Sequence, residues 1–284
     1  MRLFMSSKVI SRLLVFFVGI PAVICLVWFN QMNHLALHVV VTLLAVAAAD
    51  ELFNMFRRNF KTQNRVLVDI CSGLVPLSTL LCAVFGWPVI ITVYVFVCAV
   101  LLCYSIEVVS AKSFEDSNSH LITSTTIIFY CGFLFSFVSR MTFFEHSQQL
   151  LILFLVMVFF CDSFAWLFGN LFGKNNKGFI KASPNKSIAG FIGGFFGSVL
   201  AGVLAYKIWP EIFTGDVYKI IILGVLTAFT SIIGDLVESV FKRSSECKDS
   251  GTLIPGRGGV LDSIDSIVFS APVFYLTVTH LYAL

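Results

Sequence analysis

Long runs of apolar residues, separated by short polar segments, make up most of the sequence. A helix that crosses a membrane needs about 20 mostly apolar residues. Some connections are as short as Gly86-Trp87-Pro88. The pattern predicts an all-α polytopic membrane protein with about nine transmembrane helices, at residues 9–29, 35–56, 66–85, 87–106, 121–139, 149–170, 188–206, 218–240 and 264–283.

The first apolar run follows a short segment that contains Arg2, Lys8 and Arg12. A cleaved signal peptide would have a shorter apolar core and a cleavage site of small residues. The run at 9–29 is long enough to span a bilayer, so we expect a retained first helix. We expect no soluble domain before or after the membrane part.

The composition supports a membrane location. The chain is 58% hydrophobic and 12% charged, with a mean hydropathy of +0.92, whereas a soluble domain is usually about a quarter charged. The net charge is only +3. No long basic tract with interleaved aromatic residues suggests a nucleic-acid surface, so we expect no nucleic-acid partner.

The positions of the basic residues predict an orientation. With the N-terminus in the cytoplasm and nine alternating helices, 16 of the 19 Lys and Arg fall in cytoplasmic segments, as the positive-inside rule requires. The C-terminus then lies outside. We expect an N-terminal region at 1–150 with about five helices. The rest, at 151–284, is then a catalytic region with cytoplasmic loops at 171–187 and 242–263.

The seventh predicted helix contains two GxxxG spacings, Gly190/Gly194 and Gly193/Gly197. Small residues at this spacing let two membrane helices approach closely. The partner helix could come from the same chain or from a second copy, so a homodimer is one option.

Polar residues share one face of the eighth predicted helix: Asp235, Glu238, Ser239 and Lys242. An ionisable side chain within a spanning helix is costly, and it usually faces a polar interior. Earlier in the chain, the acidic pair Asp50-Glu51 and Asp69 lie near helix ends. They are either solvated or line a cavity, and the sequence leaves both options open.

The loop after the eighth helix, and the start of the ninth, combine charge with glycine. Ten charged residues lie within 235–265. Successive backbone N–H groups in the glycine turn at 256–259 can form an anion-binding nest. Asp262 and Asp265 are one helical turn apart. Alternatively, Asp262 simply caps the helix, with Asp265 in its first turn.

This mixture of residues indicates a chemistry. Carboxylates and hydroxyls without His or Cys suit a hard cation such as Mg²⁺. Lysine, arginine and a glycine turn suit phosphate oxygens. Together they indicate metal-assisted phosphoryl or nucleotidyl transfer.

Residues 239–265 resemble, without a gap, the C-terminal motif of the phosphatidate cytidylyltransferase (CDP-diacylglycerol synthase) family. That motif reads S-x-x-K-R, then K-D-x-G-x-x-x-P-G-H-G-G, then x-x-D-R-x-D. The chain matches it at Ser239, Lys242-Arg243, Lys248-Asp249, Gly251, Pro255-Gly256, Gly258-Gly259, Asp262 and Asp265. An earlier segment is similar to a second family motif, at Asp162, Ala165-Trp166, Gly169, Phe172-Gly-Lys174, Ser183-Pro184 and Lys186-Ser187.

The resemblance implies that the phosphate of phosphatidic acid attacks the α-phosphorus of CTP and releases pyrophosphate at a bilayer surface. It implies Mg²⁺, with a second cation as an option, and a multi-pass protein of the bacterial inner (plasma) membrane. The implied metal ligands are Asp235, Asp262 and Asp265. The implied catalytic residues are Asp235, Asp262, Asp249 and Lys248, and the implied substrate-binding residues are Lys242, Arg243, Arg257, Gly258, Gly259, Asp162, Ser183 and Lys186.

Three positions depart from the family pattern. The usual His, Arg and Glu are replaced by Arg257, Ser263 and Ala189. We expect Arg257 to compensate for the cation missing at Ser263. Otherwise, recognition of the nucleotide or of the lipid differs.

Other functions stay open from the sequence. One is a CTP-dependent lipid kinase, or a cytidylyltransferase for another lipid phosphate. Another is a transporter or a non-catalytic relative. The chain shows no inverted repeat of the kind that transporters have. It also retains the four aspartates at 235, 249, 262 and 265, and these two observations favour an enzyme.

Overall fold

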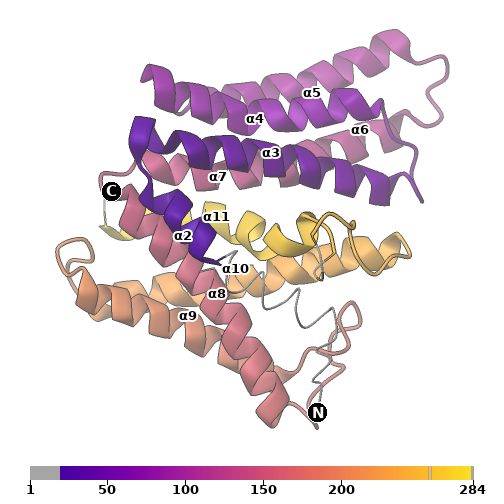
Figure 1. Cartoon of the computed structure of the whole chain (residues 1–284). Coiled ribbons are helices and arrows are strands. Elements are labelled where there is room, and N and C mark those ends of the chain that lie inside the picture. The colour runs from indigo at the N-terminus through magenta and orange to yellow at the C-terminus, as the bar shows by residue number, and fades with distance from the viewer. Residues whose placement is uncertain (1–19, 255, 257, 283–284) are drawn as a thin grey trace, which may run out of the picture. The chain divides into compact units, whose positions relative to one another are not determined.

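The computed structural model describes residues 20–254, 256 and 258–282 of the chain. In these residues the regular structure is helical and contains no β-strand (Figure 1). The span at Ser117–Phe143 is irregular, because a π-helical segment at Ile128–Leu134 and a 3₁₀ turn at Met141–Phe143 interrupt it. The α-helices are α2 (Ile20–Trp28), α3 (Gln31–Phe56), α4 (Arg65–Phe85), α5 (Ile91–Ser110), α6 (Ser117–Ile127), α7 (Phe135–Arg140), α8 (Ser147–Phe172), α9 (Ile188–Ile208), α10 (Val217–Ser244) and α11 (Leu261–Tyr282).

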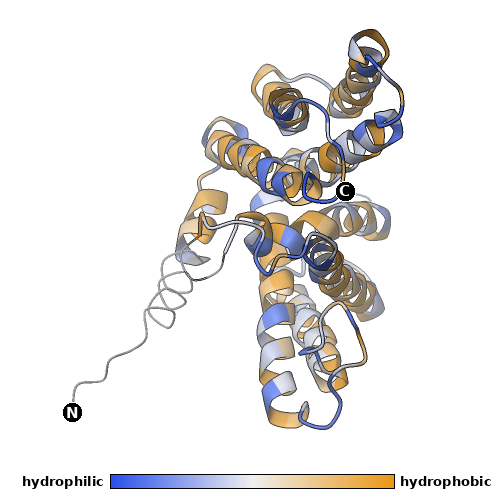
Figure 2. Ribbon diagram, turned by 90° about the vertical axis from the view of Figure 1, so that its right-hand side faces the viewer, coloured by the Kyte–Doolittle hydropathy of each residue, from blue (hydrophilic) through white to orange (hydrophobic). Residues whose placement is uncertain are grey.

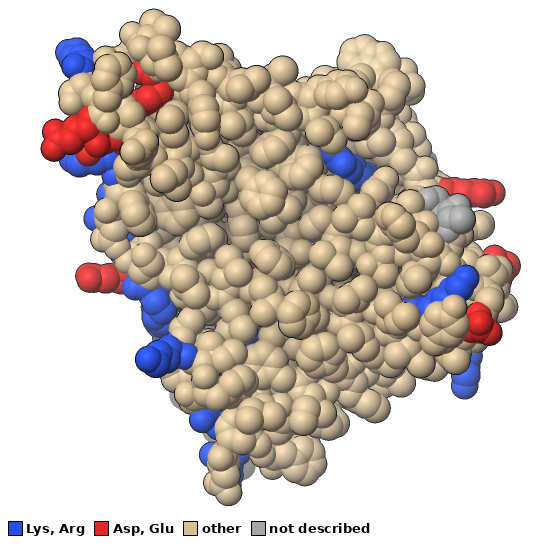
Figure 3. All heavy atoms as spheres, turned by 180° about the vertical axis from the view of Figure 1, so that it is seen from behind, with Lys and Arg blue, Asp and Glu red and all other residues tan. Residues whose placement is uncertain are grey.

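Within the described residues, eight helical stretches are long and apolar enough to cross a membrane. Figure 2 shows hydrophobic residues along most of each helix, and hydrophilic residues in the connecting loops. On the face drawn in Figure 3, charged side chains gather near the edges, and most of the middle is uncharged. The chain is therefore a multi-pass membrane protein, as its sequence predicted. Of the predicted first span at 9–29, residues 9–19 lie outside the described residues, and most of the rest forms α2.

Local sequence explains where the spans begin and end. Gly86 ends α4 in the left-handed conformation, with φ +69°, which glycine adopts without steric cost. The next helix begins at Ile91 rather than at the predicted residue 87, because Trp87 and Pro88 belong to the turn. Asn64 caps α4, where its side chain accepts a hydrogen bond from the Leu67 N–H.

The chain forms two compact units, and neither is one continuous segment. The first unit contains the described residues up to Ser139 together with Ser244–Ile264. Its helices α3, α4 and α5 pack in succession, and α6 and the π-helical segment pack against them. A Cβ at Gly132 would lie 2.7 Å from the Ser72 carbonyl oxygen, so glycine permits the close contact between α4 and this segment. The division predicted from sequence at residue 150 stays a prediction, and in the structure residues 244–264 group with the N-terminal helices.

The second unit contains Arg140–Arg243 and the described residues from Asp265 onwards. Among its helices, α8 and α9 pack closely against each other. A Cβ at Gly193 or Gly197 would lie 2.6 or 2.5 Å from the carbonyl oxygens of Phe164 and Phe160. The Gly193/Gly197 spacing therefore packs against α8 of the same chain.

Candidate active site

The glycine-rich loop before α11 forms a tight turn in the first unit. Ile254 and Gly258 exchange two backbone hydrogen bonds, of 2.8 and 3.0 Å. Gly258 has φ +108°, a backbone conformation that residues other than glycine rarely adopt. The predicted phosphate ligand Arg257 lies outside the described residues.

Asp262 accepts hydrogen bonds from both sides of this turn. Its Oδ2 lies 2.7 Å from the Ser250 nitrogen, 2.8 Å from the Gly259 nitrogen and 3.0 Å from the Ser250 hydroxyl. The helix-capping role that the sequence left open for Asp262 is not observed, because α11 begins at Leu261 and the backbone nitrogens that Asp262 binds belong to Ser250 and Gly259 in the loop. A Cβ at Gly258 would lie 2.5 Å from the same oxygen and 3.1 Å from Cβ of Asp249. The loop thus brings together four of the predicted site residues, namely Asp249, Gly258, Gly259 and Asp262.

Glu51 of α3 belongs to the same cluster, although it was not among the predicted site residues. Its side chain is buried. One carboxylate oxygen accepts the Val260 N–H, and the other accepts the Leu261 N–H, both at 2.9 Å. The second oxygen also accepts a 2.8 Å bond from the Ser250 hydroxyl. In the sequence, the only indication of this role is that Glu51 is an acidic residue near the end of a predicted span. That position does not identify the groups to which it hydrogen-bonds.

A second group of predicted residues lies in the second unit, near the end of α10. The Lys186 ammonium is 2.7 Å from Asp235, and Lys242 forms an ion pair with Glu238 one helical turn earlier. The guanidinium of Arg243 donates a 3.4 Å bond to the Ala182 carbonyl oxygen. Ser183 accepts the Lys186 N–H through its own carbonyl oxygen, in the turn that precedes α9.

Acidic side chains converge in this second group. Asp265 is buried, and it is close enough to Asp235, Glu238 and Asp162 to interact with them electrostatically. Four carboxylates thus lie in one region, together with the two ion-paired lysines 186 and 242. Bringing this many carboxylates together is unfavourable without cations to balance them.

The type and charge of these donors fit Mg²⁺, which prefers carboxylate oxygens. In the part of the chain that the structure describes, however, no three His, Cys, Asp or Glu side chains form a ready-made ligand set. Asp235 and Asp265, from α10 and α11, are the members of the predicted metal set that meet in the second unit. The third member, Asp262, lies in the first unit with Asp249. Lys248 is exposed in the same loop.

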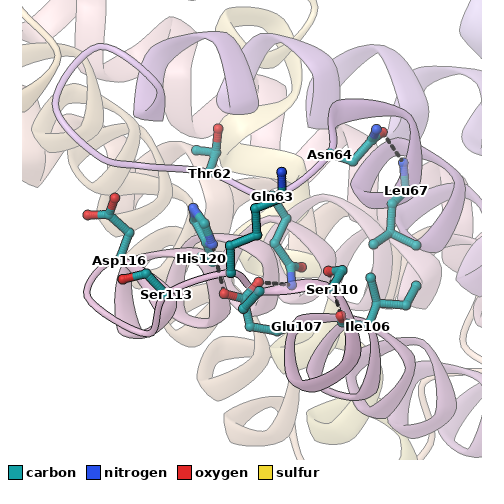
Figure 4. A pocket seen from close by; sticks show the side chains of 12 residues that line it. Thr62, Gln63, Asn64, Leu67, Ile106, Glu107, Ser110, Ser113, Asp116 and His120 are labelled. Carbon is teal, nitrogen blue, oxygen red and sulfur yellow. Dashed lines mark hydrogen bonds and ion pairs between the residues drawn. The ribbon is translucent and has the colours of Figure 1, made fainter.

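A pocket of about 410 Å³ lies in the first unit, where α4 begins and α5 ends. Figure 4 shows Gln63 and His120 pointing toward the Glu107 carboxylate. Gln63 and Ser117 donate hydrogen bonds of 2.9 and 2.7 Å to it, and His120 lies 2.9 Å away. None of the predicted site residues lines this pocket. Through these hydrogen bonds, the buried Glu107 carboxylate links α5 to α6 and to the segment before α4.

Comparison with known proteins identifies the relatives of the chain. The sequence model of the Cytidylyltransferase family matches residues 10–281. A Staphylococcus aureus protein named phosphatidate cytidylyltransferase is 30% identical over 262 residues, which cover 89% of this chain and 95% of the relative. A Haemophilus influenzae protein of the same name is 41% identical over 131 residues, but that alignment spans only 45% of each chain. A match that extends over nearly all of the predicted spans and both groups of acidic residues leads to one conclusion: this chain is a member of the cytidylyltransferase family.

Proposed function

We propose that this protein is a phosphatidate cytidylyltransferase, which makes CDP-diacylglycerol and pyrophosphate from CTP and phosphatidic acid. The observation that carries the proposal is the alignment with a relative of that name over 95% of the relative's length. The apolar helices support it, because one substrate is a lipid whose phosphate lies at a membrane surface. The named relatives come from bacteria, which supports a location in the bacterial inner (plasma) membrane.

In the proposed reaction, a phosphate oxygen of phosphatidic acid forms a bond to the α-phosphorus of CTP. The bond from that phosphorus to the β-phosphate bridging oxygen breaks, and its electron pair leaves with pyrophosphate. The nucleophile is already an anion, so the enzyme needs no strong base. Its main tasks are to neutralise charge and to align the two phosphates.

The residues divide by charge. Asp235 and Asp265 would hold Mg²⁺ in the second unit, and Asp262, in the first unit, stays a predicted metal ligand. Magnesium, when bound, supplies positive charge that neutralises the triphosphate and polarises the α-phosphorus. The basic residues 186, 242, 243, 248 and 257 would bind phosphate oxygens. Gly258 and Gly259 would let the backbone approach the nucleotide, Asp162 and Ser183 would complete the substrate contacts, and Asp249 would be a catalytic residue.

The test uses purified protein, phosphatidic acid, Mg²⁺ and CTP labelled at either the α- or the γ-phosphorus. We expect label from the α position in the lipid product, and none with the Asp262→Asn variant. Label from the γ position would instead show a CTP-dependent lipid kinase. If neither label enters the lipid, the proposed activity on phosphatidic acid is wrong.

A further inference from the structure

Glu51 lies far from the glycine loop in sequence but contacts it directly in the first unit. Its carboxylate accepts three hydrogen bonds, from the Ser250 hydroxyl and from the backbone nitrogens of Val260 and Leu261. These partners are 199, 209 and 210 residues away along the chain. A buried carboxylate retains such a position only when its hydrogen bonds compensate for lost hydration.

The Glu51 side chain also explains two glycines of the loop. A Cβ at Gly251 would lie 2.4 Å from one Glu51 oxygen, and a Cβ at Gly259 would lie 2.2 Å from the other. Any larger residue at either position would occupy the space that the carboxylate fills. Glu51 therefore restricts the loop to glycine at these two positions, together with the Ser250 hydroxyl at Gly259.

Ser250 connects Glu51 to Asp262. Its hydroxyl oxygen lies 2.8 Å from a Glu51 oxygen and 3.0 Å from Asp262 Oδ2. The backbone nitrogens of Ser250 and Gly259 bind the same Asp262 oxygen. Each lies next to a group that donates a hydrogen bond to Glu51, namely the Ser250 hydroxyl and the Val260 N–H. Glu51 thus fixes the backbone on both sides of Asp262, and the negative charge also suits the N-terminal end of α11.

We propose that Glu51 is a positioning residue for the transferase reaction. It orients Asp262 by holding Ser250 and the first turn of α11, and it does not itself contact substrate. The inference rests on the proposed function, because Asp262 matters to the rate only if it acts in that reaction. A small displacement of a reacting group can reduce the rate by about 10²-fold.

The test compares Glu51→Gln with Asp50→Asn. Glutamine has the same shape but one acceptor oxygen, so its NH₂ group must face an N–H donor of Val260 or Leu261. Asp50 is the adjacent carboxylate of α3, and its partners are Asn54 and Arg65, outside the loop. We expect E51Q to lower kcat at least tenfold while KM for CTP changes less than about threefold. We expect D50N to stay within about threefold of the wild type in both constants.

Amide hydrogen exchange, measured without CTP or Mg²⁺, gives a readout independent of activity. E51Q should speed up exchange in the peptide that covers residues 245–261 and leave α8 and α9 unchanged, and D50N should leave exchange in both regions unchanged. If E51Q does not fold, Ser250→Ala carries the test, because it removes the link to Asp262 without adding an NH₂ group. We expect S250A also to lower kcat rather than raise KM.

The outcomes separate the two proposals. Absence of α-label transfer by the wild type contradicts the proposed function. Normal transfer by the wild type, with an unchanged kcat in E51Q and S250A, contradicts the positioning role of Glu51. Faster exchange throughout the molecule would mean that Glu51 serves only general stability, and this result also overturns the inference.

Discussion

The ammonium group of Lys186 lies 2.7 Å from the carboxylate of Asp235. Lys186 comes from the loop before α9, and Asp235 lies on α10, so this ion pair joins two motifs that are separate in the sequence. Both side chains are partly exposed, at 25% and 38%. An ion pair this exposed contributes roughly 0–1 kcal/mol to stability, and its position suits a function in binding phosphate.

Replacing Lys186 with Gln should therefore reduce activity much more than stability. We expect at least a tenfold loss in kcat/KM, because a polyanionic substrate loses a cation, and a melting temperature within a few degrees of the wild type. Lys181→Gln is the matched control, since Lys181 is exposed in the same loop. Equal losses of activity in both variants would indicate a general effect of loop charge instead of a contact at Lys186.

Asp265→Asn should make the metal-free protein more stable and inactive. The buried Asp265 lies near three other carboxylates, and a neutral amide removes part of their repulsion. In EDTA we expect a melting temperature equal to or a few degrees above that of the wild type. Added Mg²⁺ should raise the melting temperature of the wild type but not that of D265N.

The control for this experiment is Asp216→Asn, an exposed carboxylate of the second unit. It should respond to Mg²⁺ as the wild type does. If D265N is less stable than the wild type in EDTA, Asp265 has a structural function that its acidic surroundings do not suggest.

Gly258→Ala and Gly178→Ala separate backbone strain from contact with Asp262. Both glycines have positive φ, +108° and +83°, so alanine costs about 1–2 kcal/mol at each. A Cβ at residue 258 would also press on Asp262 Oδ2, whereas residue 178 has no neighbour within 4 Å. We expect G258A to lose at least tenfold in kcat, and G178A to retain near-normal transfer with a similar loss of stability. Matching losses of kcat would show that strain alone explains the effect.

Gly197→Ala should destabilise the second unit. Its Cβ would lie 2.5 Å from the Phe160 carbonyl oxygen, and overpacking of this kind costs about 1–3 kcal/mol. That cost exceeds the gain of about 1 kcal/mol in helix propensity. The free energy of unfolding in detergent, with Ile192→Ala on an exposed face of α9 as control, measures the difference. A more stable G197A would mean that α8 and α9 move apart without cost.

The spans were predictable because hydropathy and helix length are local properties of the sequence. For α9, for example, the predicted start at residue 188 coincides with the observed one. The π-helical segment at Ile128–Leu134 was not predictable, since it depends on how Gly132 meets Ser72 of another helix. The motif residues were also identifiable from sequence, but their roles at the site stay predictions.

The contacts of Glu51 could not be predicted for a similar reason. No local pattern links an acidic residue of α3 to a serine and two backbone nitrogens about 200 residues later. Likewise, the pairing of Lys186 with Asp235 depends on tertiary structure, although the sequence placed both residues in family motifs.

The distance in sequence between Glu51 and its partners has a consequence for biogenesis. The ribosome completes α3 long before it makes Ser250, Val260 and Leu261, so Glu51 enters the membrane before its hydrogen-bond donors exist. An ionisable side chain without partners is costly in that environment. Translation of its N-terminal helices alone therefore cannot complete the first unit. It also needs residues 244–264, which the ribosome makes much later. A nascent chain stalled before residue 250 should accordingly leave α3 more accessible to chaperones and membrane proteases than the finished protein does.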